Sequence, residues 1–238
     1  KHEIPFKEYF LSPLTGIWKI YPTKVSLIQN LSAPKHDSIN SSIPEEARKT
    51  EYVKFKNLIE LASSVGIGGH LWIIDMKDSY FCLALLQKCI KLFGAKWFDF
   101  YIFYACLPFG LATAPRIFQL FADSLKFITE TSNKKLFYLD DFELLYHYLD
   151  DFFSGHPSED TALLQFNAFF RLLKRLDIPT STEKCVKPSQ IIVILGFLIN
   201  TIDQTVAISP QKIRKYLKNI KWLLHKKNKN KCNRKKLK

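Results

Sequence analysis

The sequence predicts an α+β fold in which a sheet is backed by helices, and three observations lead to this prediction. Of the 238 residues, 47% are hydrophobic and 20 are Phe, enough apolar side chain for a sizeable core. Strand-like segments alternate with segments of helical periodicity. Several apolar stretches end in aspartate. Alternation of this kind is typical of a layered domain with helices packed on a sheet.

The N-terminal part of the chain is expected to form strands, loops and one helix. Prolines break residues 1–50 into short apolar stretches, which favours strands and loops with little helix. Residues 45–65 have the pattern of an amphipathic helix that ends near a glycine cluster. The apolar run His70-Leu-Trp-Ile-Ile-Asp75 then predicts a strand that ends at Asp75.

The rest of the chain adds a hairpin, two long helices and a further strand. Residues 91–107 are dense in aromatic side chains and predict a β-hairpin. Helices are expected over 114–130 and over 159–176, and a strand that contains Gly196 over 190–199. The apolar residues with helical spacing are Phe118, Phe121, Leu125 and Ile128 in the first helix, and Phe166, Phe169, Phe170, Leu173 and Leu176 in the second.

The positive charge is concentrated at the C-terminus. The formal net charge is +13, but residues 211–238 hold 13 Lys and Arg residues and no acid, so the other 22 basic residues equal the 22 acidic ones. Net charge therefore does not demonstrate a basic groove in residues 1–210. The tail begins with the pattern of an amphipathic helix and then becomes rich in Lys and Asn. Contact with nucleic-acid phosphates and a disordered cationic end are both open interpretations.

Cysteine spacing and hydropathy exclude several classes of protein. The five cysteines form no Cys-x-x-Cys pair and no histidines lie at zinc spacing, which favours reduced thiols in an intracellular protein, in the cytoplasm or nucleus. No apolar run approaches the roughly 18 residues that cross a bilayer, and the N-terminus has no signal-peptide pattern, so no membrane partner is expected. The chain begins at Lys1 and its one methionine is Met76, so we expect a fragment.

Aspartates at the ends of apolar runs are the main candidates for chemistry. Asp75 ends one run, and Asp150 and Asp151 follow another, Tyr146-His-Tyr-Leu. An aspartate at the edge of a buried strand is costly to desolvate unless it is hydrogen-bonded or holds a cation. Three that converge would repel one another, and Mg²⁺ relieves that repulsion. The pattern predicts a two-metal phosphoryl-transfer site, with ordinary turn chemistry as the alternative for the Asp-Asp pair.

Three motifs in a fixed order carry a family resemblance. They are Asp75-Met-Lys-Asp-Ser-Tyr-Phe81, Leu107-Pro-Phe-Gly110 and Tyr148-Leu-Asp-Asp151. In this order the chain resembles the reverse transcriptase family, over roughly residues 10–210. The surrounding segments look most like retrotransposons of the DIRS type; they are Asn30-Leu-Ser-Ala-Pro-Lys-His-Asp-Ser-Ile-Asn40, Phe118-Gln-Leu-Phe-Ala-Asp-Ser-Leu125 and His147-Tyr-Leu-Asp-Asp-Phe152.

The resemblance implies a polymerase fingers–palm fold, with an antiparallel palm sheet backed by helices and a truncated thumb. The fingers would span about 1–70 and 85–110, and the palm about 71–84 and 111–210. Residues 211–238 would be a basic thumb start or tail, partly disordered. The implied activity is that of an RNA-directed DNA polymerase, a nucleotidyltransferase that adds dNTPs to a primer 3′ end on an RNA or DNA template.

The resemblance also implies a metal site. Asp75 and Asp150 would be the primary ligands of two Mg²⁺ ions, with Mn²⁺ as a substitute, and Asp151 would lie beside them. Two metals about 3.5–4 Å apart lower the pKa of the attacking 3′-hydroxyl and neutralise the leaving pyrophosphate. In-line displacement then depends mainly on positioning and charge stabilisation.

A second copy of the acidic motif complicates this assignment. Tyr-Leu-Asp-Asp-Phe occurs at 138–142 and again at 148–152. We expect the second copy to be the working one, because His147 precedes it and Phe-Ser-Gly and a helix follow it, as in the DIRS-type pattern. Asp140 and Asp141 would then belong to a local duplication.

Four residues correspond to the family's nucleotide-binding positions. Tyr80 would lie beneath the incoming sugar and exclude a ribose 2′-hydroxyl; a core tyrosine is the alternative. Phe109 stands where many retroviral enzymes have Gln, and Gly110 lets backbone approach the nucleotide closely. Lys184 matches the candidate general acid for pyrophosphate, with a solvated surface lysine as the alternative. Pro115 and Gln119 would lie on the helix that supports the template strand.

One departure from the family pattern raises a second hypothesis. Ser26 stands where the family has an arginine that grips the triphosphate, and only Lys19 and Lys24 lie nearby in the sequence. Losing such a contact costs ~1.5–3 kcal/mol. The second hypothesis is a catalytically decayed, nucleic-acid-binding remnant with a polymerase fold. The third is an unrelated α+β scaffold, in which Asp75 and Asp150 would lie far apart.

Overall fold

The structure is a computed structural model that describes residues 4–19, 24–136 and 144–225. The chain divides into two compact units. Unit 1 contains the described parts of Lys1–Tyr52, Met76–Tyr138 and Leu172–Ser181. Unit 2 contains those of Val53–Asp75, Leu139–Arg171 and Thr182–Lys238. The finger and palm boundaries remain predictions, because a division by packing assigns neither name.

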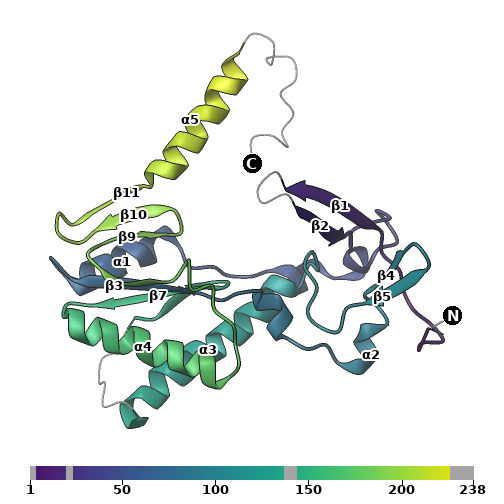
Figure 1. The fold of residues 1–238 in the computed structure, drawn as a ribbon, viewed down its shortest axis with the longest axis horizontal. Helices are drawn as coiled ribbons and strands as arrows, with labels where there is room; N and C mark the ends of the chain where they lie inside the picture. The colour runs from purple at the N-terminus through teal and green to yellow at the C-terminus, as the bar shows by residue number, and fades with distance from the viewer. Residues whose placement is uncertain (1–3, 20–23, 137–143, 226–238) are drawn as a thin grey trace. The chain divides into compact units, whose positions relative to one another are not determined.

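A four-stranded antiparallel sheet forms the centre of unit 2, and Figure 1 labels two of its strands, β3 and β7. Its strands lie in the order β6 (Tyr146–Tyr148), β7 (Asp151–His156), β3 (His70–Asp75) and β8 (Val186–Ser189). Every pairing between neighbours is antiparallel. Strand β3 is buried along nearly its whole length, as its continuous apolar run predicts.

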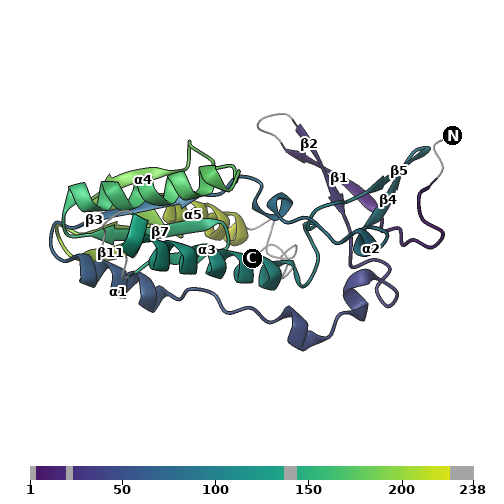
Figure 2. The same ribbon diagram turned by 90° about the horizontal axis from the view of Figure 1, so that it is seen from below.

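One face of this sheet is covered by α4 (Glu159–Arg175), which lies across β3 and β7 in Figure 2. The buried indole of Trp72 contacts the ring of Phe166, with ring centroids 6.0 Å apart, and that of Phe169 at 6.1 Å. Phe152 on β7 packs on Phe169 at 4.8 Å. The predicted buried face of this helix is therefore confirmed at these positions, whereas Leu176 follows the helix end and is 47% exposed.

The other face of the sheet packs on α1 (Phe55–Val65) and on a second antiparallel sheet. That sheet has the order β11 (Thr205–Ile208), β10 (Phe197–Asn200) and β9 (Ile191–Ile194). The core between them is apolar and fully buried; it includes Leu58, Leu61, Val65, Leu71, Ile73, Phe153, Ile192, Ile194 and Ile199.

Two element boundaries differ from the sequence prediction. The helix expected over 45–65 is a 3₁₀ turn, η2 (Glu45–Arg48), then a non-helical segment, and then α1. The strand expected over 190–199 is a hairpin of β9 and β10. Leu195 and Gly196 have φ of 51° and 78° and form its two-residue turn. Positive φ at both turn residues is what a tight hairpin requires. The turn could not be recognised in the sequence, because it lies within a continuous apolar run.

Unit 1 contains two hairpins and one long helix. The first hairpin joins β1 (Leu14–Lys19) and β2 (Lys24–Gln29), and the second joins β4 (Gly94–Trp97) and β5 (Phe100–Phe103), as predicted within 91–107. Short elements are η1 (Ile39–Ser42), η3 (Ser79–Cys82) and α2 (Gln87–Ile90).

The predicted helix from residue 114 is α3 (Ala114–Leu136). Its buried residues follow helical spacing; among those that the structure describes they are Ala114, Phe118, Ala122, Leu125 and Thr129. The predicted Ile128 is 36% exposed, because the buried stripe reaches Thr129 in that turn instead.

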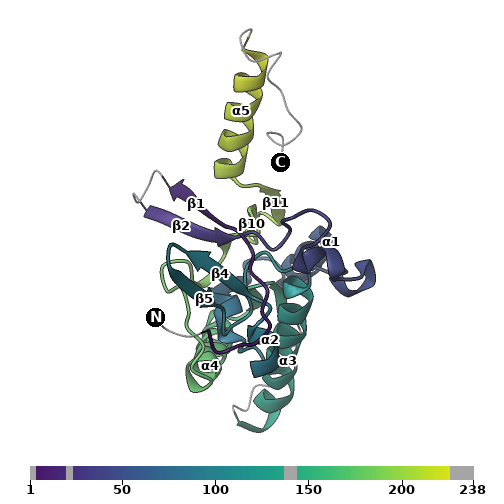
Figure 3. The ribbon, with the colours of Figure 1, turned by 90° about the vertical axis from the view of Figure 1, so that its right-hand side faces the viewer.

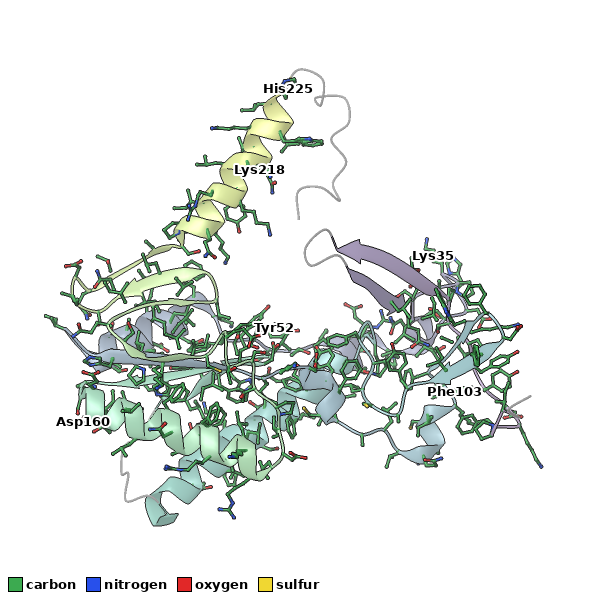
Figure 4. All side chains as sticks on the ribbon, viewed as in Figure 1. Lys35, Tyr52, Phe103, Asp160, Lys218 and His225 are labelled. Atoms are coloured by element: carbon green, nitrogen blue, oxygen red, sulfur yellow. The ribbon has the colours of Figure 1, made fainter. Side chains whose placement is uncertain are left out.

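Helix α5 (Pro210–Leu224) extends from the end of β11 in unit 2, as Figure 3 shows. The hydroxyl of Ser209 caps it by accepting a hydrogen bond from the Lys212 N–H. None of its residues is buried, and Lys218 projects from it in Figure 4. The expected amphipathic helix is therefore present, while residues 226–238 lie outside the described part of the chain. Within the described ranges, no helix has both the length and the apolar character to cross a bilayer.

Candidate active site

Asp75 and Asp151 lie directly opposite each other in the central sheet of unit 2. Asp75 is the last residue of β3 and Asp151 the first residue of β7, and the antiparallel register pairs them. Ile73 and Phe153 form the pair two residues away on the same face. Residues paired in this way have Cα atoms about 4.5–5.5 Å apart. Two carboxylates are thus held side by side where the apolar core ends.

Asp150 lies in the tight turn that precedes β7. Tyr148 on β6 pairs with Asp151, so Leu149 and Asp150 form a two-residue turn between them. Leu149 has a φ of 52°, a conformation that costs a branched residue about 1–2 kcal/mol. The 148–151 copy of the motif therefore forms the hairpin that the resemblance implies. The 138–141 copy lies outside the described residues.

Lys184 forms an ion pair with Asp75. Its Nζ lies 3.1 Å from Oδ1 and 3.0 Å from Oδ2, so it donates to both carboxylate oxygens. The Asp75 side chain is 7% exposed and the Lys184 side chain 61% exposed, so a largely exposed cation neutralises a buried carboxylate. The hydrogen bond to Asp75 raises the pKa of Lys184. The neighbouring Cys185 Sγ donates to the backbone carbonyl of Asp75 at 3.9 Å.

The three aspartate carboxylates lie close enough together to repel one another. The pKa of Asp151 is raised to about 7 by burial, by the charges of Asp150 and Asp75 and by a side-chain hydrogen bond with Asp75. The charge of Lys184 acts in the opposite direction. Burial also raises the pKa of Asp150. One ammonium cannot balance three carboxylates, so a proton on Asp151 relieves the repulsion near neutral pH.

The three carboxylates are the kind of ligand that a hard divalent cation requires, but Asp75 is in an ion pair with Lys184. Across the described residues, no group of three His, Cys, Asp or Glu side chains is spaced to hold one metal ion. The Lys184 ammonium occupies both oxygens of Asp75. Carboxylate oxygens are the ligands that Mg²⁺ and Mn²⁺ prefer. The residues fit such a cation once Lys184 leaves Asp75.

Tyr80, Phe109 and Gly110 lie together in unit 1. The Tyr80 ring is 8% exposed and packs between the rings of Phe109, at 4.9 Å, and Phe118, at 5.4 Å. Phe109 is 52% exposed, so it presents the accessible surface of this aromatic group. Gly110 has a φ of +89°, which a residue with a side chain rarely adopts.

The remaining predicted positions lie on α3 and β2 of unit 1. Pro115 is the second residue of α3, and Gln119 one turn later donates to Asp123 Oδ1 at 3.4 Å. Ser26 lies on β2, paired with Ile17 of β1.

Asn40 contacts the loop that contains Gly110, although the sequence alone predicted no role for it. Asn40 hydrogen-bonds to the backbone of both Gly110 and Ala112. Its segment, 30–40, carries part of the family resemblance, but a lone Asn among turn residues gives no other signal of its function.

Comparisons with known proteins identify the family and the fold. The family model described as reverse transcriptase (RNA-dependent DNA polymerase) matches residues 27–199. A comparison with curated protein sequences found no match.

Solved structures of foamy viral protease–reverse transcriptase are similar in fold. The dRH form in complex with double-stranded DNA has a TM-score of 0.66 at 15% identity, covering 90% of this chain and 33% of that one. The complex with an RNA/DNA hybrid has a TM-score of 0.64 at 14% identity, covering 89% of this chain and 25% of that one. The present chain therefore spans about a third or less of those proteins, and the predicted α+β polymerase fold is confirmed.

Proposed function

The chain belongs to the reverse transcriptase (RNA-dependent DNA polymerase) family, and from this premise we propose that it is the fingers–palm part of an enzyme that extends a primer 3′ end with dNTPs on an RNA or DNA template. The observation that carries the proposal is the register that sets Asp75 opposite Asp151, with Asp150 in the adjoining turn. Three carboxylates from segments far apart in the sequence have no structural need to meet at the edge of an apolar core.

In this proposal Asp75 and Asp150 are the primary ligands of two Mg²⁺ ions and Asp151 lies beside them. Bound divalent cations would lower the pKa of the attacking 3′-hydroxyl and stabilise charge on the leaving pyrophosphate. The protein's own contribution is positioning. The β3–β7 pairing fixes two carboxylates and the tight turn fixes the third. Asp151 must be deprotonated to contribute a ligand, and its pKa of about 7 couples ligation to pH.

Lys184 has two proposed roles, one before and one after a divalent cation binds. Without divalent cations it neutralises Asp75, as the two hydrogen bonds near 3 Å indicate. When a cation takes its place, the exposed lysine is free to swing toward the leaving group and to donate a proton from Nζ. Its largely exposed side chain supports such a movement, because little of it is packed against the protein.

The aromatic group of unit 1 is proposed to contact the incoming nucleotide. Phe109 would supply apolar contact, Gly110 close backbone approach, and Tyr80 the ring beneath the sugar that disfavours a ribose 2′-hydroxyl. Pro115 and Gln119 would support the template strand from α3. The packing of Tyr80 against Phe109 supports a shared role, because the two rings are in direct contact.

The proposed source is a retrotransposon of the DIRS type. The segments at 30–40, 118–125 and 147–152 support this assignment through their resemblance to that type. A reconstruction of evolutionary relationships that groups the chain with another class of element would refute it.

Primer extension in the presence of Mg²⁺ tests the proposed activity. The wild-type chain should extend a DNA primer on an RNA or DNA template, and Asp75→Asn and Asp150→Asn should each lower the rate by about 100-fold or more, because each removes a charged metal ligand. Asp160→Asn is the matched control, since Asp160 lies at the exposed start of α4 (Figure 4) and should leave the rate unchanged.

The same assay separates the competing hypotheses. Full synthesis by Asp150→Asn would show that the choice of acidic pair is wrong. Template binding without incorporation, together with synthesis gained on Ser26→Arg, would identify a decayed polymerase. Template binding without incorporation in both proteins would identify a non-catalytic, nucleic-acid-binding remnant.

A further inference from the structure

We infer that Asn40 is a positioning residue that holds the 109–112 loop in the conformation that the nucleotide contacts, a role that rests on the proposed polymerase function. Asn40 is 8% exposed and lies in η1 of unit 1, some 70 residues before the loop. Its side-chain amide bridges two backbone groups on either side of Leu111. The role is conformational, because Asn40 acts on Phe109 through the backbone.

The bridge uses both ends of the amide. Nδ2 donates to the Gly110 carbonyl at 2.8 Å, and Oδ1 accepts from the Ala112 N–H at 2.8 Å. Nδ2 also donates to Ser32 Oγ at 2.9 Å. Asn supplies both a donor and an acceptor on one short side chain. Asp would place an oxygen against the Gly110 carbonyl, and Ala would leave both backbone groups without this partner.

The backbone of Asn40 is itself held by hydrogen bonds. Its N–H donates to the Leu31 carbonyl at 3.0 Å, and its own carbonyl accepts from Arg48 Nη2 at 2.6 Å. The turn around it is closed by a capping box in which Ser38 and Ser41 each bond to the other's backbone N–H. Because the backbone of Asn40 is anchored, its side chain is a rigid support that does not follow the loop.

Besides Asn40, the loop is held by Leu111, whose side chain is buried and whose carbonyl accepts from the Ala114 N–H at 3.0 Å. Gly110 has a φ of +89°, and an ideal Cβ there would meet only the Gln29 carbonyl, at 3.6 Å, so no crowding forces the conformation. Phe109 precedes it, is 52% exposed and packs on Tyr80 at 4.9 Å. Two hydrogen bonds from a buried amide therefore fix the backbone on both sides of Leu111, directly after Phe109.

Hydrogen–deuterium exchange measures directly how strongly Asn40 holds the loop, and it needs no enzymatic activity. In the wild-type chain the Ala112 amide should be protected, because it donates to Asn40. Asn40→Ala should speed exchange in peptides covering 108–114 by about 10-fold or more. Asn40→Asp keeps an acceptor and should leave Ala112 partly protected. Ser32→Ala is the matched control, because it removes one bond of the same amide and none of the loop bonds.

Nucleotide kinetics measure the functional consequence. Asn40→Ala and Asn40→Asp should raise the KM for dNTP by about 10-fold with a smaller change in kcat, because the binding surface is displaced while the carboxylates of unit 2 are unaltered. Discrimination against ribonucleotides should fall, since it is proposed to depend on Tyr80, which packs on Phe109. Ser32→Ala should match the wild type in both respects. A purely structural role would change the amount of folded protein and leave KM as it was.

Each result decides the inference. Unchanged exchange at 108–114 in Asn40→Ala would overturn it, and so would faster exchange with an unchanged KM. If the wild-type chain incorporates no nucleotide, the proposed function fails separately, and equilibrium binding of mant-dATP (a fluorescent dNTP) replaces KM. Weaker binding by Asn40→Ala than by Ser32→Ala then supports the inference, while equal binding, or no binding by the wild type, overturns it.

Discussion

At the scale of single residues, Asp151 combines the largest electrostatic cost with a role in the proposed chemistry. Burial and two neighbouring carboxylates raise its pKa from 3.8 to about 7. A carboxylate placed opposite another in a sheet is destabilising, because like charges directly opposite repel. The folded protein therefore keeps like charges close together, and the divalent cations of the proposed site would relieve their repulsion.

This repulsion predicts an inverse dependence of stability on pH without divalent cations. The folded state binds the Asp151 proton more tightly than the unfolded state, so between pH about 4 and about 7 the free energy of unfolding should fall as pH rises. Urea unfolding in EDTA at a series of pH values measures it. Asp151→Asn should flatten this part of the profile and should be more stable than the wild type at pH 7. A wild-type profile that rises through this window would contradict the prediction.

Lys184 should compete with divalent cations for Asp75. Lys184→Met leaves a buried carboxylate without its partner, and we expect a loss of about 1 kcal/mol of stability in EDTA, a modest value because the lysine is largely exposed. The same variant should bind Mn²⁺ more tightly in isothermal titration calorimetry, because no ammonium has to be displaced. Lys187→Met, an exposed lysine on β8, is the control. Weaker Mn²⁺ binding by Lys184→Met would show that the lysine does not compete.

At the scale of elements, the register between β3 and β7 determines the site. A shift by one residue would turn Asp75 or Asp151 to the opposite face, where α4 packs. Gly155 helps to fix the register from the far end of β7, where it pairs with Leu71. A Cβ at Gly155 would lie 2.6 Å from the His70 carbonyl oxygen and 2.6 Å from Leu71 Cδ2. The close approach of α1 and β3 therefore requires glycine there.

Gly155→Ala should destabilise unit 2 and disturb the carboxylate pair together. We expect a loss of about 1–3 kcal/mol, because the backbone has to move to admit a methyl group. Thermal unfolding measures stability, and primer extension reports the site. Ser154→Ala is the control on the same strand, since Ser154 Oγ has no hydrogen-bond partner within the described residues and the smaller side chain adds no contact. Equal melting temperatures for Gly155→Ala and the wild type would contradict the prediction.

Local pattern predicted the elements well where one period dominated. The helices that became α3 and α4 and the hairpin of β4 and β5 follow from spacing and aromatic content alone. The prediction was wrong where a pattern had two interpretations. Residues 190–199 have the composition of one buried strand, and only the backbone at Leu195 and Gly196 shows that they turn. Residues 45–54 share the polarity of a helix but fold as a 3₁₀ turn and a connecting segment.

At the scale of the whole molecule, the charge is divided unequally along the chain. The 13 basic residues of 211–238 account for the entire net charge of +13. Five of them lie in 210–224, the helix α5, which buries none of its residues. A cationic helix without a buried residue is available for contact with a phosphate backbone.

Binding to a primer–template duplex should therefore depend on salt, and the dependence should weaken when residues 226–238 are removed. Every phosphate that the shortened chain no longer neutralises should reduce the slope of log K against log salt by about 0.9. Fluorescence anisotropy over a range of KCl concentrations measures this slope. An unchanged slope after the deletion would show that these residues do not touch the duplex, which would favour the interpretation of a disordered end.

The sequence by itself determined which residues could do the chemistry. Aspartates that follow apolar runs, an ordered set of motifs and helical spacing can all be identified without coordinates, because they depend only on neighbours in the chain. Tertiary structure decided which of them meet. Lys184 reaches Asp75 across 109 positions and Asn40 reaches Gly110 across 70. Contacts over such separations follow from how β3, β7 and the loops pack around a shared core, and local pattern does not determine that packing.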